Sequence, residues 1–286
     1  MHWSKHPNRW LLGPHVTLFS LWTVLPLFAI AALSFFDWNL LGDRRFVGGA
    51  NYWELLHDPY FWTALWNTTR FALLLTPLAL AGGLALAIAL QKAQSGKNAL
   101  LAIFYAPCVI SGVAAATAIA WILDVHYGVL NNLLVQFHLP KQDWVDSRAA
   151  SIFAVTGAAL WMRVGFCMVV YLAGLQEIPH DLYEAARVDG ADAWSRFRYI
   201  TWPMLHRTTL LLTVLNIVFS FHTFDLPYIM TAGGPAMTTT LLVQHLYETG
   251  FGLQRQGYAA AVAMVLFAAM VLLTACAARV QKRRSQ

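Results

Sequence analysis

Sequence motifs for catalysis are missing from this chain of 286 residues. It has no glycine-rich phosphate loop ending in Gly-Lys-Ser/Thr, no His-Glu-x-x-His zinc motif and no Gly-x-Ser-x-Gly nucleophile turn. The segment nearest to a phosphate loop is Gln94-Ser95-Gly96-Lys97-Asn98, which lacks the earlier glycine and the terminal hydroxyl. We therefore expect that the chain is not an enzyme, hydrolyses no ATP and binds no cofactor of its own.

Charged residues are scarce, at 12% of the chain, whereas hydrophobic residues make up 58% and the mean hydropathy is +0.53. This composition excludes an ordinary soluble domain and indicates an integral membrane protein. The net charge of +5 does not indicate nucleic-acid binding, because the basic residues lie in short segments beside apolar spans. Cys108, Cys167 and Cys276 lie inside apolar segments without paired or zinc-binding spacing, so we interpret them as small buried hydrophobes.

Six apolar segments are long enough to cross a bilayer, for which a helix needs about 20 residues. They are residues 16–36, 71–90, 99–123, 152–175, 208–230 and 258–278. Only two of them contain a charged residue, which is Arg163 in the fourth and Asp225 in the fifth. The sequence therefore predicts a single all-α transmembrane domain over residues 1–286, with six spans in the lipid bilayer.

Lysine and arginine are distributed unequally between the two sides of these spans, and the richer side is expected to face the cytoplasm. One side holds twelve of them: Lys5, Arg9, Lys92, Lys97, Arg187, Arg196, Arg198, Arg207, Arg279, Lys282, Arg283 and Arg284. The other side holds six: Arg44, Arg45, Arg70, Lys141, Arg148 and Arg255. The sequence thus predicts that both termini and the loop at residues 177–207 are cytoplasmic.

The loop at residues 177–207 contains the most informative pattern in the chain. Its segment Glu184-Ala185-Ala186-Arg187-Val188-Asp189-Gly190-Ala191 predicts two short helices hinged at Gly190, which supplies the positive φ that ends a helix. Asp181 is expected to cap the first helix and Asp192 the second. The second helix is expected to end about two residues before Pro203, because proline restricts the residue before it and donates no backbone hydrogen bond.

This loop resembles the cytoplasmic signature of permease subunits of bacterial ATP-binding-cassette importers. The residues that carry the resemblance are the segment 184–191 with Phe197, Ile200 and Pro203. Leu172-Ala173-Gly174-Leu175-Gln176 with Ile178-Pro179, and Phe224-Asp225 with Thr231-Ala232-Gly233-Gly234-Pro235, are similar to the carbohydrate-uptake branch of the family. The match extends over nearly the whole chain through Asn51-Tyr52, Asn67-Thr68, Pro107 and Gly128-Val129-Leu130-Asn131, and the first external region resembles that of the first of two permeases.

The resemblance implies a type I importer permease in the bacterial plasma (inner) membrane, with a coupling-helix hairpin between the fourth and fifth spans. Its partners would be a second permease subunit, two ATP-binding-cassette ATPase subunits that bind ATP and Mg²⁺, and an extracytoplasmic substrate-binding protein. The cargo would be an oligosaccharide or a related polyol, moved by alternating access. The resemblance also implies which hairpin residues contact the ATPase: Glu184, Ala185, Ala186, Asp189, Gly190 and Ala191.

Polar residues of the fifth span lie on one helical face, since Asn216, Ser220 and Thr223 are spaced at i, i+4 and i+7. This face is expected either to line the substrate path or to make hydrogen bonds to another helix. Phe219 lies beside it, and Trp161 on the fourth span is a second aromatic on which a sugar could pack. The resemblance implies a substrate path, because the family's sugar contacts map onto these parts of the two spans, and hydrogen bonding to another helix stays an equal alternative.

Arg163 lies near the middle of the fourth span, where an unpaired charge is costly and a functional role is the default expectation. It could bind substrate hydroxyls, hold the anionic group of a solute such as glycerol-phosphate, or pair with Asp225 or an acid of the second permease. Pairing is slightly favoured, because no second cation accompanies Arg163. A separate alternative is an ion-coupled secondary transporter, in which Arg163, His222 and Asp225 would carry the coupling.

Overall fold

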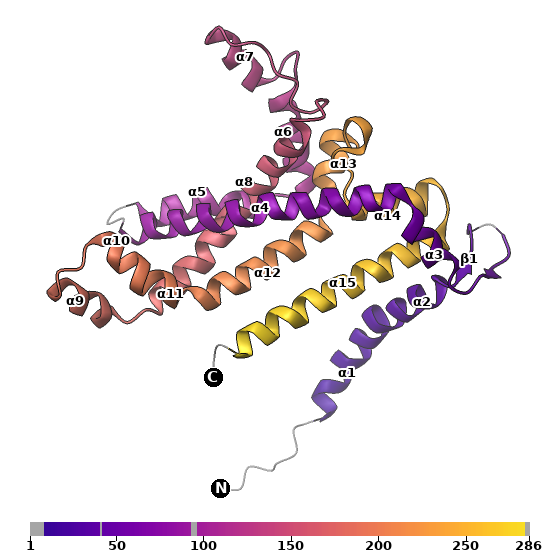
Figure 1. The fold of residues 1–286 in the computed structure, drawn as a ribbon, viewed down its shortest axis with the longest axis horizontal. Helices are drawn as coiled ribbons and strands as arrows, with labels where there is room; N and C mark the ends of the chain where they lie inside the picture. Colours follow the sequence, from indigo (N-terminus) through magenta and orange to yellow (C-terminus); the bar gives the residue numbers. More distant parts are fainter. Residues whose placement is uncertain (1–8, 41, 93–95, 284–286) are drawn as a thin grey trace. The chain divides into compact units, whose positions relative to one another are not determined.

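The computed structural model describes residues 9–40, 42–92 and 96–283, and this part of the chain is mostly helical (Figure 1). Lys5 and Arg284 of the orientation argument, and Gln94-Ser95 of the phosphate-loop comparison, lie outside the described residues. Two units are distinguished. The first holds the chain up to Pro59 with Leu246–Ala269, and the second holds Tyr60–His245 with the chain from Met270 onward.

The first unit begins with an apolar helix and ends with the start of another. Its elements in chain order are helix α1 (Arg9–Phe19), the π-helical turn η1 (Ser20–Val24), helix α2 (Leu25–Leu33), strand β1 (Phe36–Asp37), strand β2 (Arg45–Phe46), helix α3 (Ala50–His57), the π-helical turn η4 (Glu248–Gly252) and the first half of helix α15 (Gln256–Arg283). The two strands pair antiparallel, with Phe36 opposite Phe46.

Polar side chains hold the chain where α2 leads into the small sheet. Asn51, which is 6% exposed, donates its amide hydrogens to the backbone carbonyls of Ser34 at 2.8 Å and Phe36 at 3.0 Å. Arg255 donates two parallel hydrogen bonds to the Glu54 carboxylate, at 2.8 and 2.6 Å. Such bidentate pairs fix geometry as well as charge, so they fasten α3 to the segment that precedes α15.

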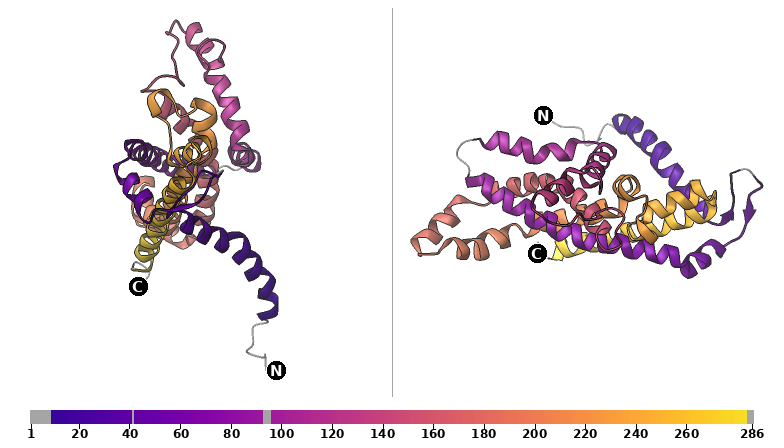
Figure 2. Two further views of the ribbon diagram at one scale, coloured as in Figure 1. Left: turned by 90° about the vertical axis from the view of Figure 1, so that its right-hand side faces the viewer. Right: turned by 90° about the horizontal axis from the view of Figure 1, so that it is seen from above.

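The second unit contains the remaining helices. In chain order they are α4 (Pro59–Lys92), α5 (Lys97–Val109), α6 (Gly112–Leu123), α7 (Val129–Gln136), α8 (Ser151–Gln176), α9 (His180–Val188), α10 (Ala193–Arg196), the π-helical turn η2 (Phe197–Thr201), α11 (Trp202–Met204), α12 (His206–His222), α13 (Asp225–Thr231), the 3-10 turn η3 (Pro235–Met237) and α14 (Leu242–Tyr247). Figure 2 shows the same elements from two further directions.

Two buried clusters form the core of the second unit. One joins α4, α8 and α12 through residues such as Leu90, Tyr171 and Leu212. The other joins α4, α6, α8 and α13 through residues such as Ile152 and Leu226. Helices α4 and α8 contribute to both clusters, so the second and fourth predicted spans are the centre of the packing.

Four helices within the described residues are long and apolar enough to cross a membrane: Gly13–Leu33, Pro59–Lys92, Ser151–Gln176 and Gln256–Arg279. They correspond to the first, second, fourth and sixth predicted spans. Two bent pairs, Lys97–Val109 with Gly112–Leu123 and Ala193–Met204 with His206–His222, would raise the number to six if each pair is one span. The predicted count of six remains a prediction.

The predicted span at residues 99–123 is divided, because α5 and α6 meet at an angle of 100°. Ile110 and Ser111 have extended backbones, with ψ of 140° and 134°. Gly112 opens α6, and the Asp225 carboxylate lies where a β-carbon at position 112 would stand. Only glycine allows α13 to approach this closely.

The predicted span at residues 208–230 is also divided, since α12 ends at His222 and α13 begins at Asp225. Pro227 explains the break. A continuous helix would need its absent N–H to bond the carbonyl of Thr223, and its ring would clash with that carbonyl. Thr223 instead adopts extended backbone angles, and the Asp225 carboxylate accepts a hydrogen bond from the Leu226 N–H at 3.1 Å.

Candidate functional site

The loop at residues 177–207 forms a hairpin of two helical arms that links α8 to α12 (Figures 1 and 2). The first arm is α9, and the second runs through α10, η2 and α11. Gly190 has the expected positive φ, at +78°, and stands at the bend. Asp192 caps the second arm as predicted, because its carboxylate accepts a hydrogen bond from the Ser195 N–H at 2.8 Å. Hydrogen bonds from Ser195 lower the pKa of the Asp192 carboxyl below its ordinary value.

Two predictions about this hairpin are wrong. Asp181 does not cap α9, since Pro179 holds the cap position without a side-chain bond and Asp181 lies inside the first turn. The second arm does not end near Thr201 but continues to Met204 and then bends by 64°. The π-helical turn η2 explains the continuation, because its wider hydrogen-bonding pattern precedes Pro203 and the proline then falls in the first turn of α11.

Aromatic side chains attach the hairpin to the spans. The Tyr183 hydroxyl on α9 lies 2.9 Å from the Thr201 hydroxyl on η2 and joins the two arms. Tyr183, Phe197 and Ile200 pack against the buried cluster of α4, α8 and α12. The hairpin is thus connected to these helices through packed side chains.

The opposite surface of the hairpin is exposed and carries the residues that the resemblance singled out. Glu184, 62% exposed at its side chain, pairs with His180 at 3.1 Å, one turn earlier on α9. Ala185, Asp189 and Gly190 are exposed, and Ala186 and Ala191 are half-buried. Val188, Trp194 and Tyr199 add apolar surface, at 88%, 68% and 78% exposed. The structure thus places the predicted contact residues on one accessible segment.

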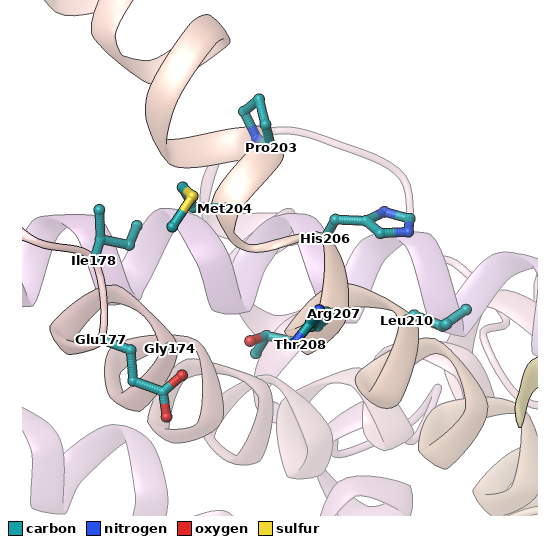
Figure 3. A pocket seen from close by; sticks show the side chains of 9 residues that line it. All are labelled: Gly174, Glu177, Ile178, Pro203, Met204, His206, Arg207, Thr208 and Leu210. Atoms are coloured by element: carbon teal, nitrogen blue, oxygen red, sulfur yellow. The ribbon is translucent and has the colours of Figure 1, made fainter. Parts of the chain in front are cut away.

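A cavity of about 490 Å³ lies where the hairpin meets the spans (Figure 3). It is lined by Gly174, Glu177, Ile178, Pro203, Met204, His206, Arg207, Thr208 and Leu210. Figure 3 shows Glu177 and Ile178 on one side and Arg207 and Leu210 on the other. The ends of α8 and α12 are thus not fully packed together at the base of the hairpin.

Within the spans, the structure brings together Arg163 of α8 with Asn216 and Phe219 of α12. The Arg163 Nε donates a hydrogen bond to the Asn216 side-chain oxygen at 3.2 Å. Its guanidinium carbon lies 4.6 Å from the centre of the Phe219 ring and 4.5 Å from that of Phe166. The Asn216 amide nitrogen donates to the Leu212 carbonyl at 2.8 Å, which turns the oxygen toward Arg163.

Three other predicted path residues are not joined to this group in the same way. The Ser220 hydroxyl donates to the Asn216 carbonyl at 2.8 Å, and the Thr223 hydroxyl donates to the Phe219 carbonyl at 2.9 Å. Both side chains are buried, so these hydroxyls satisfy their own helix. Trp161, 44% exposed, lies two residues from Arg163, which is about 200° around the helix.

The predicted pair of Arg163 with Asp225 is not formed. Within the described residues, no carboxylate lies within ion-pair distance of Arg163. Asp225 instead lies against Gly112 and accepts a hydrogen bond from the Leu226 N–H in the first turn of α13. His222 bonds the Val218 carbonyl of its own helix at 2.9 Å and is exposed. These three residues therefore form no connected relay.

Sequence reasoning missed Phe166 and Cys167 as neighbours of Arg163. Cys167 is fully buried and accepts a hydrogen bond from the Asn216 amide at 3.3 Å. The spacing could have identified both, because residues three and four positions after Arg163 lie on its own helical face. The prediction that the cysteines are buried is confirmed for Cys167, whose thiol also helps to hold Asn216, but it is wrong for Cys276, which is exposed, and Cys108 is half-buried.

Comparison with known proteins identifies the family. The family described as "Binding-protein-dependent transport system inner membrane component" matches residues 79–286. A probable ABC transporter permease protein of Pyrococcus horikoshii is 36% identical over 91% of this chain and 88% of its own length. The sulfoquinovosyl glycerol transport system permease of Agrobacterium fabrum is 34% identical over 94% and 88%. The trehalose/maltose transport system permease of Thermococcus litoralis is 29% identical over 92% and 90%.

A solved structure has the same fold. A bacterial ABC transporter involved in the import of the acidic polysaccharide alginate has a chain that superposes with a TM-score of 0.84 at 23% identity, covering 97% of this chain and 96% of that one. The helical architecture is therefore that of the type I ABC importer permeases. The chain belongs to the family of binding-protein-dependent transport system inner membrane components, and it is a permease of an ABC importer.

Proposed function

We propose that this chain is one of two permeases in an importer of sugar-type solutes. In this assembly it packs against a second permease subunit, two ATPase subunits bind ATP and Mg²⁺ at the cytoplasmic face, and an extracytoplasmic binding protein delivers the cargo. The six predicted spans form one transmembrane domain with both termini in the cytoplasm. Membership of the ABC permease family replaces the alternative of an ion-coupled carrier.

The exposed hairpin is the observation that carries the coupling part of this proposal. Within the described part of the chain, the interaction of the Glu184 carboxylate is the exposed pair with His180, and such surface pairs contribute little free energy. It can therefore exchange His180 for a basic group of an ATPase at small cost. When ATP closes the ATPases, the hairpin is pushed, and Phe197 and Ile200 transmit the displacement to α4, α8 and α12.

The centre at Arg163 supports a polar solute path between α8 and α12. A guanidinium, a buried amide and two aromatic rings meet there, and this combination suits a polyol, which needs hydrogen-bonding groups beside an apolar platform. The relatives named for sulfoquinovosyl glycerol and for trehalose/maltose transport support a glycoside as cargo. Asn216, Phe219 and Arg163 are the path residues. Ser220, Thr223 and Trp161 stay predicted path residues, although none of them contacts Arg163 among the described interactions.

Reconstitution into liposomes tests the assignment. Proteoliposomes that hold this chain, the second permease and the ATPases, supplied with ATP and the binding protein loaded with labelled disaccharide, are expected to accumulate sugar against its gradient. Liposomes that hold this chain alone are the matched control and are expected to accumulate none. Uphill accumulation by the chain alone contradicts the proposal, as does failure to co-purify an ATPase subunit with it.

A further inference from the structure

Arg163 is a half-buried cation that nothing in the described chain neutralises. Its single hydrogen bond runs from Nε to the neutral Asn216 side chain, and no described carboxylate is within ion-pair distance. Asp225, the only acid within the predicted spans, is engaged at the start of α13. A charge in apolar surroundings without a counter-ion is unfavourable, so the site requires an anion from outside the chain.

The side chain is also fixed in one orientation before any anion arrives. Asn216 is fully buried and its own amide hydrogens bond Leu212 and Cys167, so its oxygen cannot turn away from the Arg163 Nε. Phe166 and Phe219 contact the guanidinium through their rings, an arrangement that favours a cation. The Nε edge of the guanidinium is therefore occupied and its position is set.

The remaining edge of the guanidinium matches one kind of ligand. The four N–H groups on the two terminal nitrogens make no hydrogen bond to the part of the chain that the structure describes. Two parallel N–H groups on a planar fork suit the two oxygens of a carboxylate or sulfonate. Hydroxyls of a neutral sugar would satisfy the donors but would leave the charge without a counter-ion.

We propose that Arg163 selects an acidic sugar, that is, a glycoside carrying one carboxylate or sulfonate group, and this inference rests on the proposed function as a sugar importer. The anionic group binds the free edge of the guanidinium. The sugar ring packs beside Phe219, and Asn216 is a positioning residue that holds the arginine. Arg163 is thus a determinant of specificity inside the membrane, separate from the selection made by the binding protein.

A matched pair of disaccharides tests this assignment. Cellobiose and its uronic acid differ only in one CH₂OH group that becomes a carboxylate. Equilibrium dialysis of each labelled sugar against the detergent-purified importer, without the binding protein, measures affinity at the permeases alone. We expect the acid to bind about tenfold more tightly, which corresponds to about 1.4 kcal/mol.

Variants locate the preference in this residue. Arg163→Gln is expected to weaken binding of the acid about tenfold and to change the affinity for cellobiose by less than about twofold. Arg163→Lys is expected to retain most of the preference for the acid. Arg70→Gln is the control, because Arg70 also lies over an aromatic ring, Phe153, but at 5.9 Å and away from α12. Assembly of each variant with its partners is checked by size-exclusion chromatography.

Other outcomes overturn the inference. Equal affinity of the wild-type importer for the two sugars does so even if Arg163→Gln fails to assemble. An equal loss of affinity for both sugars in Arg163→Gln also overturns the inference. It would indicate that a carboxylate of a partner subunit pairs with Arg163 and stabilises the packing. ATP-driven uptake of cellobiose without any preference for the acid leaves the proposed function intact and contradicts only the inference about Arg163. If neither sugar is bound or taken up, both the proposed function and this inference are contradicted.

Discussion

The hairpin at residues 177–207 and the centre around Arg163 both use charged side chains, but their surroundings are opposite. On the hairpin, the Glu184 carboxylate lies 3.1 Å from the His180 ring nitrogen, and the two side chains are 62% and 74% exposed. In the spans, Arg163 is half-buried among Phe166, Phe219 and a neutral amide. The Glu184 carboxylate has a partner and is exposed to water. The Arg163 guanidinium has no counter-ion among the described residues and is largely removed from water.

This contrast indicates two kinds of binding. An exposed pair contributes about 0–1 kcal/mol, so Glu184 can change partners during each transport cycle without a large barrier. A desolvated cation is costly until an anion arrives, so Arg163 distinguishes strongly between an occupied and an empty site. The hairpin is therefore suited to repeated contact with a protein, and the centre is suited to selection of a solute. The following predictions test this division.

The largest effect is expected from a charge reversal on the hairpin. Glu184→Lys should abolish transport, because a lysine repels the basic groups that we propose on the ATPase, while the protein remains in the membrane. Uptake by vesicles and the amount of ATPase that co-purifies with the chain are the measurements. Asp181→Lys is the control, since Asp181 is exposed on the same helix and has no proposed contact. Unchanged uptake by Glu184→Lys would remove the coupling assignment.

A smaller effect is expected when the support of the arginine is removed. Asn216→Leu leaves the Arg163 Nε without its acceptor, and a lost hydrogen bond to a charged group costs about 1.5–3 kcal/mol. Transport is expected to fall about tenfold, mainly through a higher KM, and the fall should be larger for an acidic sugar than for a neutral one. Ser220→Ala is the comparison, because its hydroxyl bonds only the Asn216 carbonyl, and it should change KM less than twofold. A larger increase of KM in Ser220→Ala would indicate that the solute path lies closer to Ser220.

Much of the hairpin could be predicted from the sequence, because its determinants are local. The positive φ of Gly190 and the Asp192 cap depend on residues within a few positions, and both are present. The prediction for the end of the second arm is wrong, because the π-helical turn at residues 197–201 admits Pro203 within a helix. A wider turn of this kind depends on packing of Phe197 and Ile200 against the spans, which local sequence does not report.

The centre in the spans was only partly predictable for a different reason. The spacing of Asn216 and Phe219 placed them on one face, and the structure puts Arg163 against that face. The pair with Asp225, one of the alternatives for Arg163, is not formed because the break at Pro227 carries Asp225 to the start of another helix, beside Gly112. Opposite charges in the sequence therefore do not show that two side chains are close. Here the helix break before Asp225 and its packing against α6 decide where this carboxylate lies.

The bend of the hairpin can be strained without altering any contact. Gly190 has φ of +78°, and a β-carbon added there would meet nothing within 4 Å, so Gly190→Ala carries only the left-handed backbone cost of about 1–2 kcal/mol. We expect substrate-stimulated ATP hydrolysis to fall a few-fold. Gly96→Ala is a matched control, because Gly96 has φ of +72° and equally open space but lies at the start of α5. An equal loss in both variants would indicate general destabilisation rather than a role of the hairpin bend.

The smallest effect concerns the cap of the second arm, and it depends on pH. Hydrogen bonds from Ser195 lower the pKa of Asp192, so the ionised cap stabilises the helix above the ordinary aspartate pKa, and this stabilisation is lost as the pH falls through the lowered value. Hydrogen exchange of the Ser195 amide, corrected for its intrinsic pH dependence, should therefore accelerate in acid. Asp192→Asn keeps a good cap without a titrating group and should remove this pH dependence, whereas Asp192→Ala should exchange quickly at every pH. Acid-induced acceleration that persists in Asp192→Asn would assign the titration to another group. Because the cap is exposed and we propose that transport depends on the other arm at Glu184, uptake should change little in either variant. This result would separate the stability of the hairpin from its proposed contact with the ATPase.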